Sequence, residues 1–253
     1  MKPDALFLLG LAAAAAGAIN SVAGGGSLIS WPAAVAAGLS QVTASATNTV
    51  ALTPGSLASA WAYRRELGQG RRLTLLFCVP AAVGSLIGGL LLFAAPESVF
   101  ENLVPVLVLG ATVVLVVKDS LWKRAAEHTN PSRFRVGLVS AGVLLVAIYG
   151  GYFGAGIGIL TLALLAAVRP NDIHALNAMK CVIAGVMNGV AAVYFVALGR
   201  AHLEAAAAMA VGSISGGFGG AALARRVDAG TVRWIVVGIG VLLSLLLAYR
   251  RWS

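Results

Sequence analysis

Long stretches of this chain contain no charged side chain, and they dominate its pattern of hydrophobic and polar positions. These stretches cover Ala5–Tyr63, Leu73–Pro96, Asn102–Val117, Val136–Val168, Ala205–Ala224 and Trp234–Tyr249. A helix that crosses a bilayer needs about 20 apolar residues. Ala, Leu, Gly and Val follow one another without the alternation of barrel strands, and a helix satisfies its own backbone polar groups in hydrocarbon. The pattern predicts an all-α, polytopic membrane protein.

The two halves of the chain resemble each other weakly. Short motifs recur in the same order at separations of 128 to 131 residues: Gly84–Gly89 with Gly212–Gly217, Ala46–Asn48 with Ala175–Asn177, Gly24–Gly26 with Gly154–Gly156, and Tyr63 with Tyr194. Many secondary transporters consist of two such repeats and bind substrate between them. Because the apolar start at Met1–Gly17 has a counterpart in the second half, we expect a membrane segment there and not a cleaved signal peptide.

The repeat predicts the domain organisation. Repeat 1 spans residues 1–117, a basic cytoplasmic linker spans 118–135, and repeat 2 spans 136–253. Each repeat begins with a pair of short helical segments broken by glycine, at 5–39 and 136–168. Three transmembrane helices then follow in each: 42–63, 73–95 and 99–117 in the first repeat, and 173–198, 203–223 and 232–249 in the second.

The glycine-rich breaks at Asn20–Ser27 and Gly150–Gly158 fall near the middle of the membrane, because each flanking segment covers about half of a ~30 Å core. Two arrangements fit. A hairpin would give each half three full crossings and opposite orientations, whereas one broken helix would give four crossings and parallel halves. The two arrangements place the same number of basic residues on the cytoplasmic side, so the positive-inside rule does not choose between them. The inverted form is favoured, since irregular backbone at mid-depth is common in inverted-repeat transporters.

Composition narrows the function. Hydrophobic residues make up 59% of the chain and charged residues 11%, and the net charge is +9. The basic residues cluster at the ends of predicted spans, as in cytoplasmic loops that face anionic lipid, so nucleic acid is not an expected partner. Cys78 and Cys181 lie far apart in apolar segments, without the spacing of a disulfide framework or metal site. No catalytic motif is present, and we expect neither enzyme activity, nor a cofactor, nor a metal.

The glycine-rich breaks are the first candidate binding elements. Each opens onto a new helical segment, whose unpaired N–H groups and positive dipole end favour an anion. The candidate residues are Asn20, Gly24, Gly25, Gly26 and Ser27 in the first break and Gly154 and Gly156 in the second. Close helix packing is the alternative, and it is the preferred interpretation for Gly84, Gly88, Gly212, Gly216 and Gly220.

Lys180 is the most informative single residue, because it stands alone in the apolar stretch Ala175–Leu198. A lysine within a membrane is costly and usually faces a cavity, a partner or a substrate path, although it can also reach the interface. Asn177 and Asn188 fall on the same helical face as Lys180. Thr47 and Asn48 are polar candidates on the corresponding span of the first half, where asparagine can also join helices.

These residues resemble the sulfite exporter family of the TauE/SafE type. The resemblance covers nearly the whole chain and rests on Gly17–Ile29, Ala46–Asn48 and Tyr63–Arg65, and on the run from Gly150 through Lys180 to Asn188. It implies a multi-pass permease of the bacterial inner membrane for small sulfur-containing or organic anions. By the same resemblance Gly24–Gly26, Asn48, Gly154, Gly156, Lys180 and Asn188 would be site positions. Some members carry a lysine where this chain has Thr49, which leaves the anion and its charge open.

Together these features predict an exporter of a small anion such as sulfite, thiosulfate or an organosulfonate, working by alternating access at a midplane site. An inside-negative potential drives each negative charge outward with about 2.3 kcal/mol per 100 mV, so anion export needs no coupling ion. An importer of an organic anion or other metabolite, or a non-transporting scaffold or sensor, remains the alternative. The expected partners are the anion and membrane lipid, and a homo-oligomer is left open.

Overall fold

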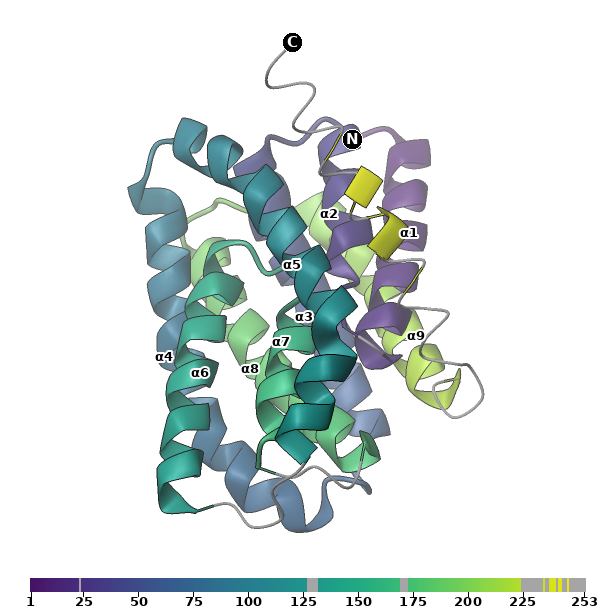
Figure 1. Ribbon diagram of the computed structural model, residues 1–253. Helices are drawn as coiled ribbons and strands as arrows, with labels where there is room; N and C mark the ends of the chain where they lie inside the picture. Colours follow the sequence, from purple (N-terminus) through teal and green to yellow (C-terminus); the bar gives the residue numbers. More distant parts are fainter. Residues whose placement is uncertain are drawn as a thin grey trace.

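The computed structural model describes residues 1–22, 24–126, 132–168 and 173–223, together with a few positions between 234 and 245. The described part is all-helical, without strands, as predicted (Figure 1). Its elements are α1 (Pro3–Val22), α2 (Ser27–Ala36), α3 (Gln41–Ala62), the 3₁₀ turn η1 (Gly68–Gly70), α4 (Arg71–Ala94), α5 (Glu97–Ala126), α6 (Arg133–Tyr152), α7 (Ile157–Ala166), α8 (Ile173–Ala197) and α9 (Leu203–Leu223). Most of the predicted span 232–249, and residues 127–131 of the predicted linker, lie outside the described residues.

Helix length separates crossing helices from half-crossing ones. Among the described residues, α1, α4, α6, α8 and α9 are long and apolar enough to cross a membrane. Helices α2 and α7 have 10 residues each, which is about 15 Å of rise and half of the hydrocarbon core. The chain therefore contains two short helices that can reach only mid-depth.

Each short helix folds back along the helix before it. A Cβ added to Gly26 at the start of α2 would lie 2.1 Å from the Ala16 carbonyl oxygen of α1. In α6 a Cβ on Gly142 would lie 2.8 Å from the Leu164 side chain of α7. Both pairs are therefore hairpins and not single broken helices. The α1–α2 hairpin lies in the upper part of Figure 1 and the α6–α7 hairpin in the lower part.

The breaks are shorter than the sequence predicted. Helix α1 continues to Val22, so Asn20 and Ser21 are helical, and α6 continues to Tyr152. Gly24, Gly25, Gly154 and Gly156 have φ angles of 83°, 90°, 81° and 78°. Only glycine adopts such angles without a steric cost, and these glycines therefore fix where the chain reverses. Helix α5 also extends through much of the predicted linker, to Ala126.

Contacts between helix ends define the two sides of the protein. The amino group of Met1 pairs with Glu204 at 2.8 Å, which places the starts of α1 and α9 together. The Arg200 guanidinium lies 5.5 Å from the Phe93 ring, which adds the end of α4. We call this the amino-terminal side. The opposite side, reached at the end of α3 and the start of α4 and α6, carries Arg64, Arg65, Arg71, Arg72, Arg133 and Arg135 and is called the basic side.

Two glycine seams hold helices of different halves in backbone contact. A Cβ on Gly88 of α4 would lie 2.0 Å from the Ile148 oxygen of α6, and one on Gly216 of α9 would lie 2.0 Å from the Ala14 oxygen of α1. No side chain larger than hydrogen fits at either place. The packing interpretation of these glycines is confirmed, since small residues let membrane helices approach this closely.

Candidate functional site

The tips of the two hairpins contact each other inside the protein. A Cβ on Gly24 would lie 2.8 Å from the Ile159 nitrogen at the start of α7. The Ser27 hydroxyl donates to the Gly154 carbonyl at 3.5 Å, and the Ser45 hydroxyl of α3 donates to the Phe153 carbonyl at 3.4 Å. The irregular backbone of both hairpins is thus covered by protein, as membrane interiors require.

Lys180 of α8 lies at this junction and is 1% exposed. Its Nζ donates to the Asn177 Oδ1 at 2.9 Å and to the Ser21 backbone oxygen at 3.3 Å. Ser21 belongs to the last turn of α1, whose carbonyls carry the negative end of the helix dipole. The cost of a lysine at mid-membrane, about 2.5–3.5 kcal/mol on insertion scales, is offset in part by these acceptors. Lys180 does not reach the interface.

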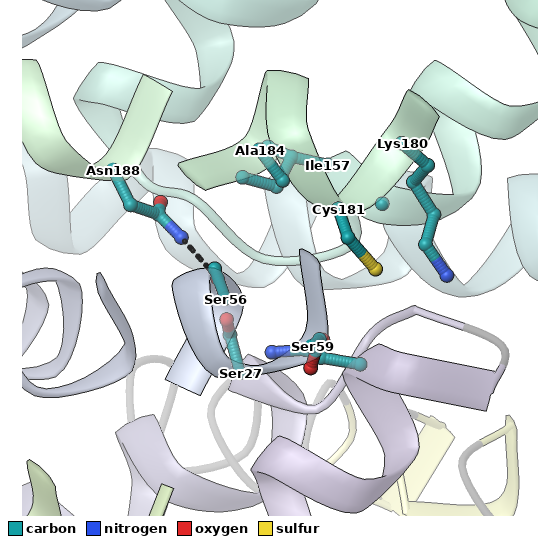
Figure 2. A pocket seen from close by; sticks show the side chains of 10 residues that line it. Ser27, Ser56, Ser59, Ile157, Lys180, Cys181, Ala184 and Asn188 are labelled. Atoms are coloured by element: carbon teal, nitrogen blue, oxygen red, sulfur yellow. Dashed lines mark hydrogen bonds between the residues drawn. The ribbon is translucent and has the colours of Figure 1, made fainter. Parts of the chain in front are cut away.

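A cavity opens beside the lysine, between α3, α8 and the two hairpin tips (Figure 2). Its lining consists of Asn20, Ser27, Ser56, Ser59, Ile157, Gly158, Lys180, Cys181, Ala184 and Asn188. The cavity volume is about 20 Å³, which suits about one water molecule. A polyatomic ligand is larger, so it could enter only if the surrounding helices moved apart.

Neutral polar groups complete the lining. The Asn188 Nδ2 donates to the Ser56 Oγ at 3.3 Å and so joins α8 to α3 (Figure 2). The Asn20 Oδ1 accepts from the Gly26 backbone nitrogen at 2.8 Å, which closes the first hairpin. Hydroxyls and amides of this kind can turn to donate hydrogen bonds to an oxyanion. The lining therefore combines one ammonium group with several reorientable donors.

The helix ends at the cavity add partial charges. Ile157 and Gly158, at the N-terminus of α7, form part of the lining, and Ser27 brings the N-terminus of α2. The N-terminus of a helix carries about +0.5 charge and exposes unpaired N–H groups. These two ends and Lys180 make the cavity suited to a negatively charged guest.

Aromatic rings fill the space between the second hairpin tip and the amino-terminal side. The Phe153 ring centroid lies 5.5 Å from that of Trp31, 5.9 Å from Phe100 and 6.3 Å from Tyr149. The cavity, by contrast, lies nearer the basic side. Ser56 and Ser59 are close to the C-terminal end of α3, and Cys181 is in the first half of α8, which begins on that side.

The structure brings most of the predicted site residues together. Asn20, Ser27, Lys180 and Asn188 line the cavity, and Asn177 contacts it through Lys180. The predicted glycines form the two hairpin tips: Gly24, Gly25 and Gly26 in the first, and Gly154 and Gly156 in the second.

Two predicted site residues lie elsewhere. The Thr47 Oγ1 accepts from the backbone nitrogen of His202, close to the amino-terminal side and outside the lining. Asn48 is buried, and its Oδ1 has no hydrogen-bond partner in the described part of the chain, but it does not line the cavity either.

Sequence reasoning missed six lining residues, which are Ser56, Ser59, Ile157, Gly158, Cys181 and Ala184. The two serines lie three residues apart on one face of α3, and Cys181 follows Lys180 directly. In the described residues no three His, Cys, Asp or Glu side chains gather where they could hold a metal ion.

Residues 9–247, almost the whole chain, match the family described as "Sulfite exporter TauE/SafE". This chain belongs to that family. Its described residues include five helices that are long and apolar enough to cross a membrane.

Individual relatives of this TauE/SafE member are named as transporters without a substrate. "Probable membrane transporter protein ORF9" of Sinorhizobium sp is 29% identical over 153 residues, which is 60% of this chain and 58% of that protein. "Probable membrane transporter protein YfcA" of Escherichia coli strain K12 is 30% identical over 163 residues, 62% of this chain and 58% of the relative. A Haemophilus influenzae "Probable membrane transporter protein" is 26% identical over 164 residues, 63% of this chain and 62% of the relative.

These matches span about three-fifths of the length of each relative. No solved structure matches the chain significantly.

Proposed function

We propose that this transporter exports a small anion such as sulfite, thiosulfate or an organosulfonate across the bacterial inner membrane. The observation that carries the proposal is the position of Lys180, a buried ammonium group that lines the cavity between the hairpin tips. A cation at mid-depth in a membrane transporter is expected to face the substrate path. The helix N-termini of α2 and α7 add to its attraction for an anion.

Alternating access would follow from an inverted repeat of the two halves. The glycine seams support this arrangement: Gly17 of α1 packs on the Ser213 oxygen of α9, as Gly151 of α6 packs on the Ser85 oxygen of α4. The short helices α2 and α7 also enter from opposite parts of the molecule (Figure 1). Rocking of one half against the other would open the cavity alternately to each side.

The distribution of arginines supports an orientation. Loops rich in Arg and Lys face the cytoplasm, and in the described residues the basic side carries the larger cluster. The amino-terminal side then faces outward, and the cavity is nearer the cytoplasm. Under an inside-negative potential an anion that enters from the cytoplasm leaves downhill, which favours export over import.

Flux of anions in proteoliposomes tests the proposal. Sulfite, thiosulfate and methanesulfonate are supplied to the wild type, to Lys180→Gln, and to Lys2→Gln as a control at a lysine outside the cavity. We expect at least one anion to move in the wild type and in the Lys2→Gln protein, and none in Lys180→Gln. Thermal unfolding shows whether the variants are folded, and an anion that binds the native state raises the Tm of the wild type. Undiminished flux in folded Lys180→Gln refutes the proposed role of Lys180.

A further inference from the structure

A groove between α4 and α8 opens on the apolar exterior of the helices, away from the cavity at the hairpin tips. Its volume is about 500 Å³, far more than the ~30 Å³ that a water molecule occupies in the liquid. The Tyr194 hydroxyl is the one polar side-chain group of the described lining. An apolar groove of this size on a membrane-facing surface suits a hydrocarbon chain. The lining residues are Leu86, Gly189, Val190, Val193, Tyr194 and Ala197.

Close contact between α4 and α8 forms the floor of the groove. A Cβ on Gly89 of α4 would lie 3.1 Å from the Phe195 ring and 3.2 Å from the Tyr194 ring of α8. The Ser85 hydroxyl of α4 also donates a hydrogen bond to the Met187 backbone oxygen of α8. The two helices are therefore packed together beneath the groove, which is a hollow on their joint surface.

The groove extends from the middle of the membrane to the amino-terminal side. Helix α4 ends at Ala94 and α8 at Ala197. Leu86 and Gly189, at the deep end of the groove, each lie about 12 Å before these helix ends. One leaflet contributes about half of the ~30 Å hydrocarbon core. The groove therefore covers most of the depth of the leaflet on the amino-terminal side.

An arginine lies where the groove reaches the amino-terminal side. Arg200 is exposed, and its guanidinium lies 5.5 Å from the centroid of the Phe93 ring. The Phe93 ring in turn lies 6.4 Å from the ring of Tyr194, which lines the groove. No carboxylate among the described residues forms an ion pair with Arg200. Aromatic and basic side chains at the ends of membrane helices lie at the level of the lipid headgroups.

We propose that the groove binds an anionic phospholipid of the leaflet on the amino-terminal side, with one acyl chain along α4 and α8 and the phosphate at Arg200. Guanidinium groups bind phosphate oxygens in pairs. The order of the two parts matches a phospholipid, because the apolar groove lies at hydrocarbon depth and the cation follows at headgroup depth.

A second copy of the chain fits this groove less well than a lipid. Two copies related by a twofold axis along the membrane normal present the same surface to each other at the same depth. Their Arg200 guanidinium groups would then face each other across the interface, where like charges repel.

A phosphatidylglycerol that carries a photoreactive diazirine on its acyl chain tests the proposal. The probe is added to the purified protein in detergent micelles, and labelled peptides are identified by mass spectrometry. We expect labelling within residues 189–197. Unlabelled phosphatidylglycerol should compete with the probe better than phosphatidylcholine does, and free sn-glycerol 3-phosphate should not compete.

Four variants separate the two parts of the site. Arg200→Gln should reduce labelling of this segment about fivefold, the effect of one basic residue beside anionic lipid, and Arg200→Lys should retain most of it. Val193→Trp enlarges a side chain that is 71% exposed in the groove and should block the label. Val79→Trp is the matched control, because Val79 of α4 is 66% exposed outside the groove.

Thermal unfolding confirms that each variant is folded before labelling. Equal labelling of the wild type and folded Arg200→Gln, equal competition by phosphatidylcholine, or no label within residues 189–197 overturns the proposal. A dimer that folded Val193→Trp dissociates, together with an unlabelled groove, would show that a second copy occupies it and would overturn the proposal as well. None of these outcomes depends on whether the protein transports an anion.

Discussion

Lys180 on α8 donates a hydrogen bond from its Nζ to the backbone oxygen of Ser21, in the last turn of α1. One half of the chain thus supplies the cation and the other half a carbonyl acceptor. A carbonyl at a helix C-terminus is a good partner for an ammonium group but carries only a fraction of a charge. This hydrogen bond therefore helps to hold the lysine in place at the junction of the two halves.

The Asn20 side chain should affect both the stability of the first hairpin and the affinity of the proposed anion site, and two substitutions should separate these effects. Asn20→Ala removes the acceptor for the Gly26 nitrogen and should lower the free energy of unfolding by about 1 kcal/mol. Asn20→Asp keeps an acceptor but adds a negative charge to the lining that contains Lys180. We expect the aspartate variant to stay stable and to bind anion at least tenfold more weakly. Anion-induced shifts in Tm measure both effects, and wild-type affinity in Asn20→Asp would contradict this account.

The α1–α9 seam predicts a position-specific response to an added methyl group. Gly216→Ala drives a Cβ to within 2.0 Å of the Ala14 oxygen, whereas a Cβ on Gly219 of the same helix meets nothing within 4 Å. We expect Gly216→Ala to destabilise the protein by roughly 1–3 kcal/mol, as overpacking does. Gly219→Ala should be neutral or slightly stabilising, because alanine is the better helix former. Unfolding in denaturant compares the two, and equal stability would show that the seam is not a tight contact.

The two cysteines should respond differently to bound anion. Cys181 lines the cavity beside Lys180, whereas Cys78 lies on α4 against the apolar cluster of α6 and α8. Labelling by a small maleimide should slow in the presence of a transported anion only at Cys181. Cys78→Ala keeps this protection and Cys181→Ala abolishes it. Mass spectrometry of labelled peptides provides the measurement. Protection at Cys78 alone would place the anion away from the cavity.

The side chains of Asn188 and Ser56 should be energetically coupled. Their side chains lie 3.3 Å apart across the interface of α8 and α3. In a double-mutant cycle with Asn188→Ala and Ser56→Ala we expect a coupling energy of about 0.5–1.5 kcal/mol. Thr53→Ala serves as the control, because the Thr53 hydroxyl bonds within α3 to the Thr49 oxygen at 2.8 Å. Additive effects for Ser56 and Asn188 would mean that the hydrogen bond does not form in the membrane.

Much of the helical layout follows from the sequence because hydrocarbon tolerates few alternatives. The predicted span 42–63 corresponds to Gln41–Ala62, and 73–95 to Arg71–Ala94. The predicted ends of the glycine-rich breaks were less accurate. Nothing local stops α1 at Asn20, and the helix ends only where Gly24 and Gly25 adopt positive φ. The role of the predicted site residues in binding stays a prediction.

Ser56 and Ser59 gave no usable signal in the sequence. A serine in a membrane helix usually bonds to the carbonyl four residues earlier, and both do so here, to Leu52 and Gly55. Their place in the cavity depends on how α3 packs against α8, which no local pattern specifies. The sequence did not indicate the backbone acceptor for Lys180 either, since any backbone oxygen can accept a hydrogen bond from an ammonium group.

The glycine seams determine which helices can move relative to one another. Where the Ile148 oxygen rests on Gly88 and the Ala14 oxygen on Gly216, the helices have no intervening side chains that could change rotamer. Sliding along either seam would drive carbonyls into backbone, so α1 with α9, and α4 with α6, must each travel as one stiff pair. Helix α3 is tied to α9 in the same way, since a Cβ on Gly55 would lie 2.6 Å from the Ser213 oxygen. Any widening of the cavity then falls to the contacts between α3 and α8, where side chains meet and the hydrogen bond from Asn188 to Ser56 can break and reform.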